Sequence, residues 1–108
     1  MSISIDDFAK VEIRLGRITS VEDIPEARKP MYKMTVDFGS FTKQCVGGIK
    51  SSYSKDELLG KQVVAVVNLI PKSVAGVQSE CMLLAAFDEA TISLLSPDKD
   101  LPPGTQVG

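Results

Sequence analysis

The two most apolar stretches of the chain, residues 63–70 and 81–87, are separated by a polar segment. Short runs of apolar and β-branched residues are typical of strands that are buried on both sides or curled in a barrel. Pro71 ends the pairing of the first strand because it donates no backbone hydrogen bond, and Gly76 permits a turn that a β-carbon would resist. The sequence therefore predicts two barrel strands with a loop standing out between them.

The first half of the chain alternates apolar and polar residues, which is the pattern of half-buried strands. The alternation that begins at Val11 changes phase at Gly16. This change predicts a bulge or bend at the glycine, as a small barrel needs in order to close. Residues 31–36 and 41–49 resume the alternation on either side of a Gly-Ser turn, and they predict a hairpin.

A single helical turn is expected between the third and fourth strands. Ser54 with Glu57 three residues later has the form of a capping box, and Gly60 is typical of a helix C-terminus. The prolines and charges of residues 24–30 predict a loop. This pattern predicts an all-β fold, a five-stranded OB-fold Greek-key barrel with a short helix between strands 3 and 4.

Length and composition limit the class of protein. A chain of 108 residues supports one hydrophobic core, so residues 1–108 are predicted to form a single domain. No apolar run approaches the roughly 20 residues of a membrane span, and the N-terminus lacks an apolar signal core. We therefore expect a cytoplasmic protein without membrane insertion.

The sequence contains no histidine, which excludes Ser-His and Cys-His nucleophilic chemistry. Cys45 and Cys81 do not have the spacing of metal ligands and are expected to be buried thiols. The acidic pairs 6–7 and 56–57 are expected to begin helical turns rather than to act in catalysis. These observations predict that the protein is not an enzyme and has no catalytic residues, no cofactor and no metal site.

The charges are unevenly distributed, although the net charge is only −2. Residues 28–72 carry eight basic and three acidic side chains, a local charge of +5, whereas the rest of the chain carries −7. Such a distribution is compatible with a cationic face for a polyanion and equally with a solvated mixed surface.

Several separated segments resemble, in the same order, the tRNA-binding domain family, an OB-fold module of tRNA-binding proteins and of some methionyl-tRNA synthetases. They are "VDFG" at 36–39, "VGGI" at 46–49 and "ELLGKQVVAVVNLIPKSVAGVQSE" at 57–80. Other segments resemble the CsaA group of this family, stand-alone homodimers described as export-related chaperones. They are "IDDFAKVEIRLGRI" at 5–18, "PEAR" at 25–28 and "LLSPDKDLPPGTQVG" at 94–108.

The resemblance implies a surface that binds nucleic acid or peptide, made of the loop and a basic flank. Its residues are Arg28, Lys29, Lys33, Lys43, Asn68, Lys72 and Ser79. Two departures from the family pattern remove positive charge from this surface: Ala75 replaces an arginine of the tRNA-binding members, and Glu80 adds a carboxylate.

The resemblance to stand-alone members also implies a homodimer that forms through the terminal extensions. We expect it to bury apolar residues after position 90, namely Ile92, Leu94, Leu95, Leu101 and Val107. The alternative is that this segment packs on its own barrel.

Two functions follow from the residues and the resemblance. The first is a CsaA-like export-related chaperone, a homodimer that binds unfolded or export-bound polypeptides in an apolar groove; candidate lining residues are Met31, Tyr32, Met34 and Phe41. Ordinary barrel core is the alternative for that set. The second function is a stand-alone structure-specific tRNA-binding protein that relies on phosphate contacts and shape.

Overall fold

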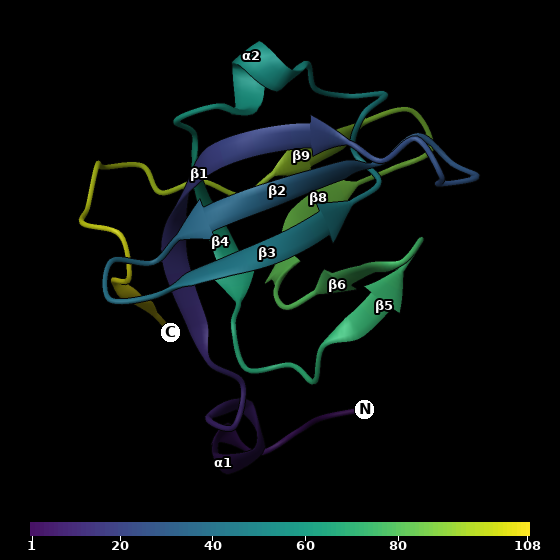
Figure 1. Cartoon of the computed structure of the whole chain (residues 1–108). Coiled ribbons are helices and arrows are strands. Elements are labelled where there is room, and N and C mark those ends of the chain that lie inside the picture. Colours follow the sequence, from purple (N-terminus) through teal and green to yellow (C-terminus); the bar gives the residue numbers. More distant parts are fainter.

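Five strands form the barrel of the computed structural model, which describes all residues 1–108 (Figure 1). In the order in which they pair across the sheet they are β3 (Thr42–Gly47), β2 (Tyr32–Asp37), β1 (Ile13–Asp23), β4 (Gln62–Val66) and β7 (Met82–Leu83). All of these pairings are antiparallel. The prediction of an all-β, five-stranded OB-type barrel is confirmed.

Strand β1 belongs to both sides of the barrel. Its first half, from Ile13 to Arg17, pairs with β4, and its second half, from Arg17 to Asp23, pairs with β2. The register shifts between Ile18 and Ser20, so the bulge lies at Thr19 and not at Gly16, where the sequence pattern placed it. The bulge lets one long strand turn from one partner to the other.

Gly16 has a different role from the one expected. A β-carbon at this position would lie 2.5 Å from Cγ1 of Val36 and 2.7 Å from Cε1 of Phe38. Both of these side chains are buried in the core. The glycine therefore allows core side chains of the neighbouring strand to pack directly on the backbone of β1.

The smaller elements extend the barrel at its ends. They are the helices α1 (Ile5–Phe8) and α2 (Lys55–Leu58), the hairpin strands β5 (Lys72–Val74) and β6 (Val77–Ser79), the hairpin strands β8 (Ala85–Phe87) and β9 (Ile92–Leu94), and β10 (Gln106–Val107). The predicted strand 81–87 is thus two strands, β7 and β8, which have different partners. Neither helix is long and apolar enough to cross a membrane.

Helix α2 confirms the predicted capping box. The Ser54 hydroxyl accepts a hydrogen bond from the Glu57 backbone N–H at 3.2 Å, and the Glu57 carboxylate accepts one from the Ser54 N–H at 2.9 Å. Gly60 follows with a positive φ of 82°. The turn directs Leu58 into the barrel, where its side chain is fully buried.

The structure contradicts the prediction that Met31, Tyr32, Met34 and Phe41 line an open apolar groove. Tyr32 and Met34 are buried in it, because the alternation of β2 places them on the same inner face as Val36. Phe41 is half-buried and stacks on Phe38 with ring centroids 5.2 Å apart. Three of the four candidates therefore belong to the core or pack against it, and only Met31 lies outside this cluster.

The C-terminal segment packs on its own barrel. Strand β10 pairs with Ile13 and Arg14 of β1, and backbone hydrogen bonds join Leu15 to Gly104 and Thr105 at 2.7 and 2.9 Å. The Gln62 side chain donates to the carbonyl of Leu101. These contacts fix the tail against its own barrel, although Leu95 and Leu101 of the same segment remain 43% exposed.

Substitution of Gly16 by alanine tests the close packing on β1. We expect Gly16→Ala to lower the free energy of unfolding by about 1–3 kcal/mol, the usual cost of overpacking a core. Gly48→Ala is the matched control, because its β-carbon would meet only Met31 Cε at 3.9 Å, and it should change stability by less than about 0.5 kcal/mol. Urea unfolding measures both, and equal effects would contradict this account of Gly16.

Candidate functional site

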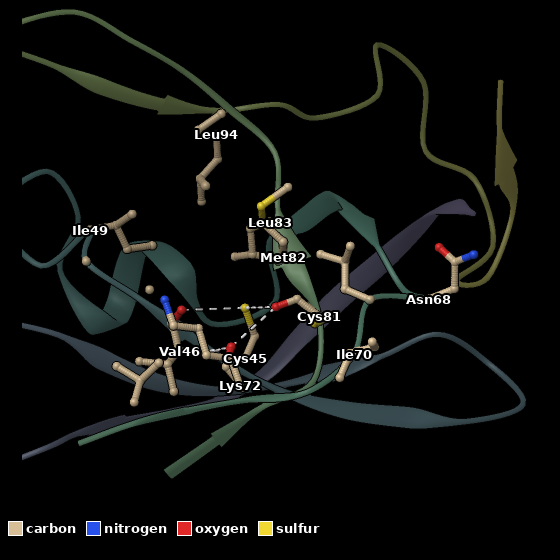
Figure 2. A pocket seen from close by; sticks show the side chains of 16 residues that line it. Cys45, Val46, Ile49, Asn68, Ile70, Lys72, Cys81, Met82, Leu83 and Leu94 are labelled. Carbon is tan, nitrogen blue, oxygen red and sulfur yellow. Dashed lines mark hydrogen bonds between the residues drawn. The ribbon is translucent and has the colours of Figure 1, made fainter. Parts of the chain in front are cut away.

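A cleft of about 780 Å³ lies between the barrel and the β5–β6 hairpin (Figure 2). Its walls come from β3 and the residues that follow it, from the segment 68–74, from 79–85 and from β9. Eleven of its sixteen lining residues are hydrophobic. Clefts of this size that are mainly apolar are the usual form of ligand sites in proteins.

The floor and the mouth of the cleft differ in exposure. Cys45, Cys81 and Leu94 form part of the floor and belong to the buried core. At the mouth, Ile70 is 92% exposed and Met82 is 48% exposed, although both are large apolar residues. Apolar side chains that gather at a concave surface and remain in contact with water are typical of a site that a partner covers.

The hairpin that borders the cleft turns in two residues. Val74 pairs with Val77, while Ala75 and Gly76 have positive φ values of 51° and 81°. Positive φ at both central residues is characteristic of the turn that suits the twist of a hairpin. The glycine was predicted from the sequence, whereas an alanine in this conformation is uncommon.

The base of the hairpin closes the barrel against β3. The Glu80 backbone N–H donates to the Gln44 carbonyl at 2.7 Å, and the Glu80 carboxylate accepts from the Gln44 N–H at 2.8 Å. The Gln44 side chain donates to the Gln78 carbonyl at 2.9 Å. The Glu80 carboxylate thus satisfies a backbone donor of a strand edge, a structural role that sequence reasoning missed.

Three of the expected binding residues line the cleft: Asn68, Lys72 and Ser79. The Asn68 amide accepts from Glu12 N–H at 2.8 Å and donates to the Lys10 carbonyl at 2.7 Å, so it holds the N-terminal segment. The Ser79 hydroxyl accepts from a backbone N–H of β3 at 3.1 Å. Lys72 is exposed and makes no ion pair, and it places a free positive charge beside the apolar walls.

The other four expected residues lie outside the cleft. Arg28 and Lys29 are exposed in the loop between β1 and β2, without an ion pair. Lys33 pairs with Glu22 at 3.2 Å, and the Lys43 ammonium lies 5.9 Å from the centre of the Phe41 ring. The structure therefore places three of the seven residues at the cleft and four outside it, with Lys33 and Lys43 toward opposite ends of the β2–β3 ladder.

Acids at the end of β1 pair with three lysines of the basic segment and offset part of its charge. The Asp23 carboxylate accepts hydrogen bonds from the ammonium groups of Lys50 at 2.7 Å and Lys55 at 2.8 Å. These two cations hold the pKa of the Asp23 carboxyl below its usual value, and Asp23 in turn raises the pKa of Lys55. The local charge of +5 in the sequence is thus not a continuous cationic face in space.

The residues expected at a dimer interface fall into two groups. Leu94 is part of the core of its own chain, Ile92 packs against that core, and the backbone of Val107 pairs with β1. Leu95 and Leu101 are each 43% exposed. Leu94 is therefore not available to a partner, because it faces the inside of the barrel.

Sequence reasoning missed exposed apolar residues at two places. Ile5 and Phe8 of α1 are 77% and 38% exposed, and the helix projects away from the barrel in Figure 1. Their spacing of three places both on one helix face, which was a readable signal. Ile70 lies in the loop between β4 and β5, and Met82 begins β7. Both belong to apolar runs of the sequence, whose pattern does not distinguish cleft residues from core residues.

The family model described as a putative tRNA binding domain matches residues 13–106. The chain belongs to this family. The methionine–tRNA ligase of Methanococcus maripaludis strain C5 is 44% identical over 105 residues, which are 97% of this chain and 16% of that ligase. The chain therefore spans about a sixth of the length of this curated relative.

Solved structures with the same fold include CsaA chaperones. The CsaA chaperone protein of Picrophilus torridus is 39% identical with a TM-score of 0.92, over 99% of this chain and 100% of that one. The chaperone CsaA of Bacillus anthracis strain Ames is 36% identical with a TM-score of 0.93, over the full length of both chains. The resemblance found in the sequence, both to the family and to its CsaA group, is confirmed.

The pH dependence of stability tests the Asp23 ion pairs. Because the folded-state pKa of Asp23 lies below its usual value of 3.8, its stabilising effect is present above that pH and disappears as the pH falls through the lowered pKa. We expect Asp23→Asn to be less stable than the unaltered chain at neutral pH, with a difference that shrinks in acid. Urea unfolding between pH 7 and pH 2 measures it.

The control for this measurement is Glu26→Gln, which removes a carboxylate that makes no ion pair. Its stability should stay parallel to that of the unaltered chain over the same range. A difference between Asp23→Asn and the unaltered chain that stays constant down to the lowest pH would contradict the assignment.

Proposed function

We propose that this protein is a CsaA-like, non-catalytic chaperone that binds unfolded or export-bound polypeptides as a homodimer in the cytoplasm, with residues 1–108 as its single domain. The observation that carries the proposal is the apolar cleft with Ile70 and Met82 exposed at its mouth. The similarity to two CsaA chaperones over the whole chain supports the same function.

The chemistry of the cleft suits a variable apolar ligand. Burial of a large aliphatic side chain against such walls contributes roughly 1.5–3 kcal/mol, without any directional requirement. Met82 adapts its shape to different neighbours because its side chain is unbranched. The Asn68 and Ser79 side chains are already hydrogen-bonded within the chain, so few polar groups are left to select one sequence. A site of this kind holds extended segments that expose apolar residues.

tRNA binding is the second candidate, and a specific observation favours it. Arg28, Lys29, Lys43 and Lys72 are cations that make no ion pair in the structure. The family to which the chain belongs is described as tRNA-binding. Against this candidate, Lys33, Lys50 and Lys55 pair with two carboxylates at the end of β1, and cations held in ion pairs add less to phosphate binding than free ones.

The homodimer is proposed from apolar surface at both termini. Ile3 and Ile5 are more than half exposed, and Phe8 is exposed on the same segment. Leu95 and Leu101 add exposed apolar surface near the C-terminal end. A two-fold contact that buries the same patch on both copies would remove these residues from water.

The first test measures the affinity for a fluorescently labelled, unfolded polypeptide at low and high salt. An apolar cleft should bind it almost equally at both. Ile70→Asp should weaken binding about tenfold, since the lost apolar burial and the desolvated carboxylate together exceed 1.4 kcal/mol. Leu59→Asp is the control, because Leu59 is about equally apolar, 49% exposed and outside the cleft.

Bulk tRNA is the comparison ligand in the same experiment. Phosphate contacts would weaken steeply with salt, and Lys43→Ala combined with Lys72→Ala would reduce both the affinity and the salt slope. Tight, salt-dependent tRNA binding together with polypeptide binding that Ile70→Asp leaves unchanged would overturn the chaperone proposal in favour of the second candidate.

Sedimentation equilibrium tests the homodimer. The unaltered chain should have twice the 11.6 kDa mass of one copy. Ile5→Asp combined with Phe8→Asp should give monomers, because it places charges on the apolar face of α1 without disturbing any buried residue. Asp6→Ala, in the same exposed helix, should leave the dimer intact. A monomeric unaltered chain, or a charged variant that stays dimeric, would refute this interface.

A further inference from the structure

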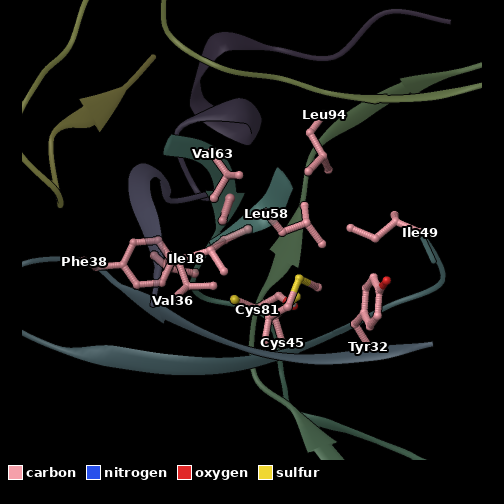
Figure 3. Close-up of a cluster of buried hydrophobic side chains, with 13 residues drawn as sticks. Ile18, Tyr32, Val36, Phe38, Cys45, Ile49, Leu58, Val63, Cys81 and Leu94 are labelled. Atoms are coloured by element: carbon pink, nitrogen blue, oxygen red, sulfur yellow. The ribbon is translucent and has the colours of Figure 1, made fainter. Parts of the chain in front are cut away.

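Two cysteines lie together on the floor of the cleft, and neither the fold nor the proposed function requires a thiol there. Cys45 comes from β3 and Cys81 from the segment between β6 and β7. The Cys45 thiol donates a hydrogen bond to the Cys81 carbonyl at 3.1 Å. Figure 3 shows the two residues side by side in the core, and both are free thiols.

The two thiols also interact directly through their side chains. The Cys81 thiol, with weaker help from the Leu83 backbone and the Ser79 hydroxyl, lowers the pKa of Cys45. The Cys45 thiol and burial together raise the pKa of Cys81. Of the two thiols, Cys45 therefore loses its proton more readily, and Cys81 keeps its own. When the more acidic thiol is oxidised to a sulfenic acid, a second thiol beside it can complete a disulfide.

The surroundings allow both access and a small adjustment of the backbone. Both cysteines line the floor of the cleft but are only 2% and 5% exposed, so a local opening of the floor, and not unfolding of the chain, is enough for a small solute to reach the sulfur atoms. Cys81 lies outside any strand, between the end of β6 and the start of β7. A disulfide requires its two α-carbons to lie within about 7 Å. An irregular segment can meet this requirement more readily than two residues in a continuous ladder.

We propose that Cys45 and Cys81 form an oxidative modification site, at which hydrogen peroxide converts the two thiols into an intramolecular disulfide across the cleft floor. The Cys45 thiolate attacks one peroxide oxygen and, with one proton, releases water to leave a sulfenic acid. The Cys81 thiol then attacks that sulfur, the sulfur–sulfur bond forms and a second water leaves. Two thiols are oxidised and one peroxide is reduced to two waters. The inference does not depend on the proposed function.

The disulfide would join β3 to the segment that leads into β7, two parts of the chain 36 residues apart. A bridge over such a loop constrains the unfolded chain more than the folded one. The oxidised protein should therefore unfold at a Tm higher by about 5 °C or more, and dithiothreitol should reverse the change.

The test treats the folded full-length chain with hydrogen peroxide at low protein concentration, and then alkylates it with N-ethylmaleimide in denaturant. We expect the intact mass to fall by two hydrogen atoms, no cysteine to be alkylated, and digestion to give one peptide that contains both residues. Cys45→Ser and Cys81→Ala should each abolish the loss of mass. Because the first readout uses the unaltered chain, it stands even where a variant folds poorly.

Several outcomes would overturn the proposal. Two alkylated cysteines after exposure to peroxide would show that the pair does not react. A mass gain of two oxygen atoms on one cysteine, or a covalent dimer on a non-reducing gel, would show that the sulfurs react separately. A disulfide that lowers the Tm would show that the bond needs a geometry that the native packing does not supply.

Discussion

The double pairing of β1 is the constraint on which the rest of the structure depends. One strand supplies the partner of β4 through its first half and the partner of β2 through its second half. This requires the bulge at Thr19, where the register shifts, and a backbone at Gly16 on which Val36 and Phe38 can pack. The barrel curls around this strand. The side chains on the inner face of the barrel form the hydrophobic core, on which the other elements pack.

The cleft is a consequence of how the barrel closes. Gln44 of β3 joins Glu80 through two short hydrogen bonds, which hold the base of the β5–β6 hairpin against the sheet. The hairpin itself turns outward at Ala75 and Gly76 and leaves space between its inner face and the barrel. The polar loop that interrupts the apolar sequence is thus the wall of an apolar site. The same closure brings Cys45 and Cys81 together on the floor of that site.

Much of the fold was predictable because its signals are local. The capping box of Ser54 and Glu57 and the turn at Gly76 depend on residues within a few positions of one another, and the structure has both. The change in the apolar–polar alternation correctly predicted a bulge in β1, but the predicted position, Gly16, was wrong. The pattern of one strand does not show which neighbouring side chains press on Gly16. The local charge of residues 28–72 also overstated the cationic surface. Asp23 lies outside that range in the sequence but pairs with Lys50 and Lys55 in the structure.

The sequence by itself determined the five barrel strands, the short helix and the residues that turn the chain, because these follow from alternation, capping and turn chemistry along a continuous segment. It determined the family in another way, through the resemblance of several separated segments to known members. Only the tertiary structure decided which apolar residues are core and which line a cleft. Tyr32 and Ile70 are both large and apolar, yet one is inside the barrel and the other is in contact with water at the cleft mouth. The difference is set by segments distant in sequence that cover one residue and leave the other open, and no periodicity along the chain records that contact.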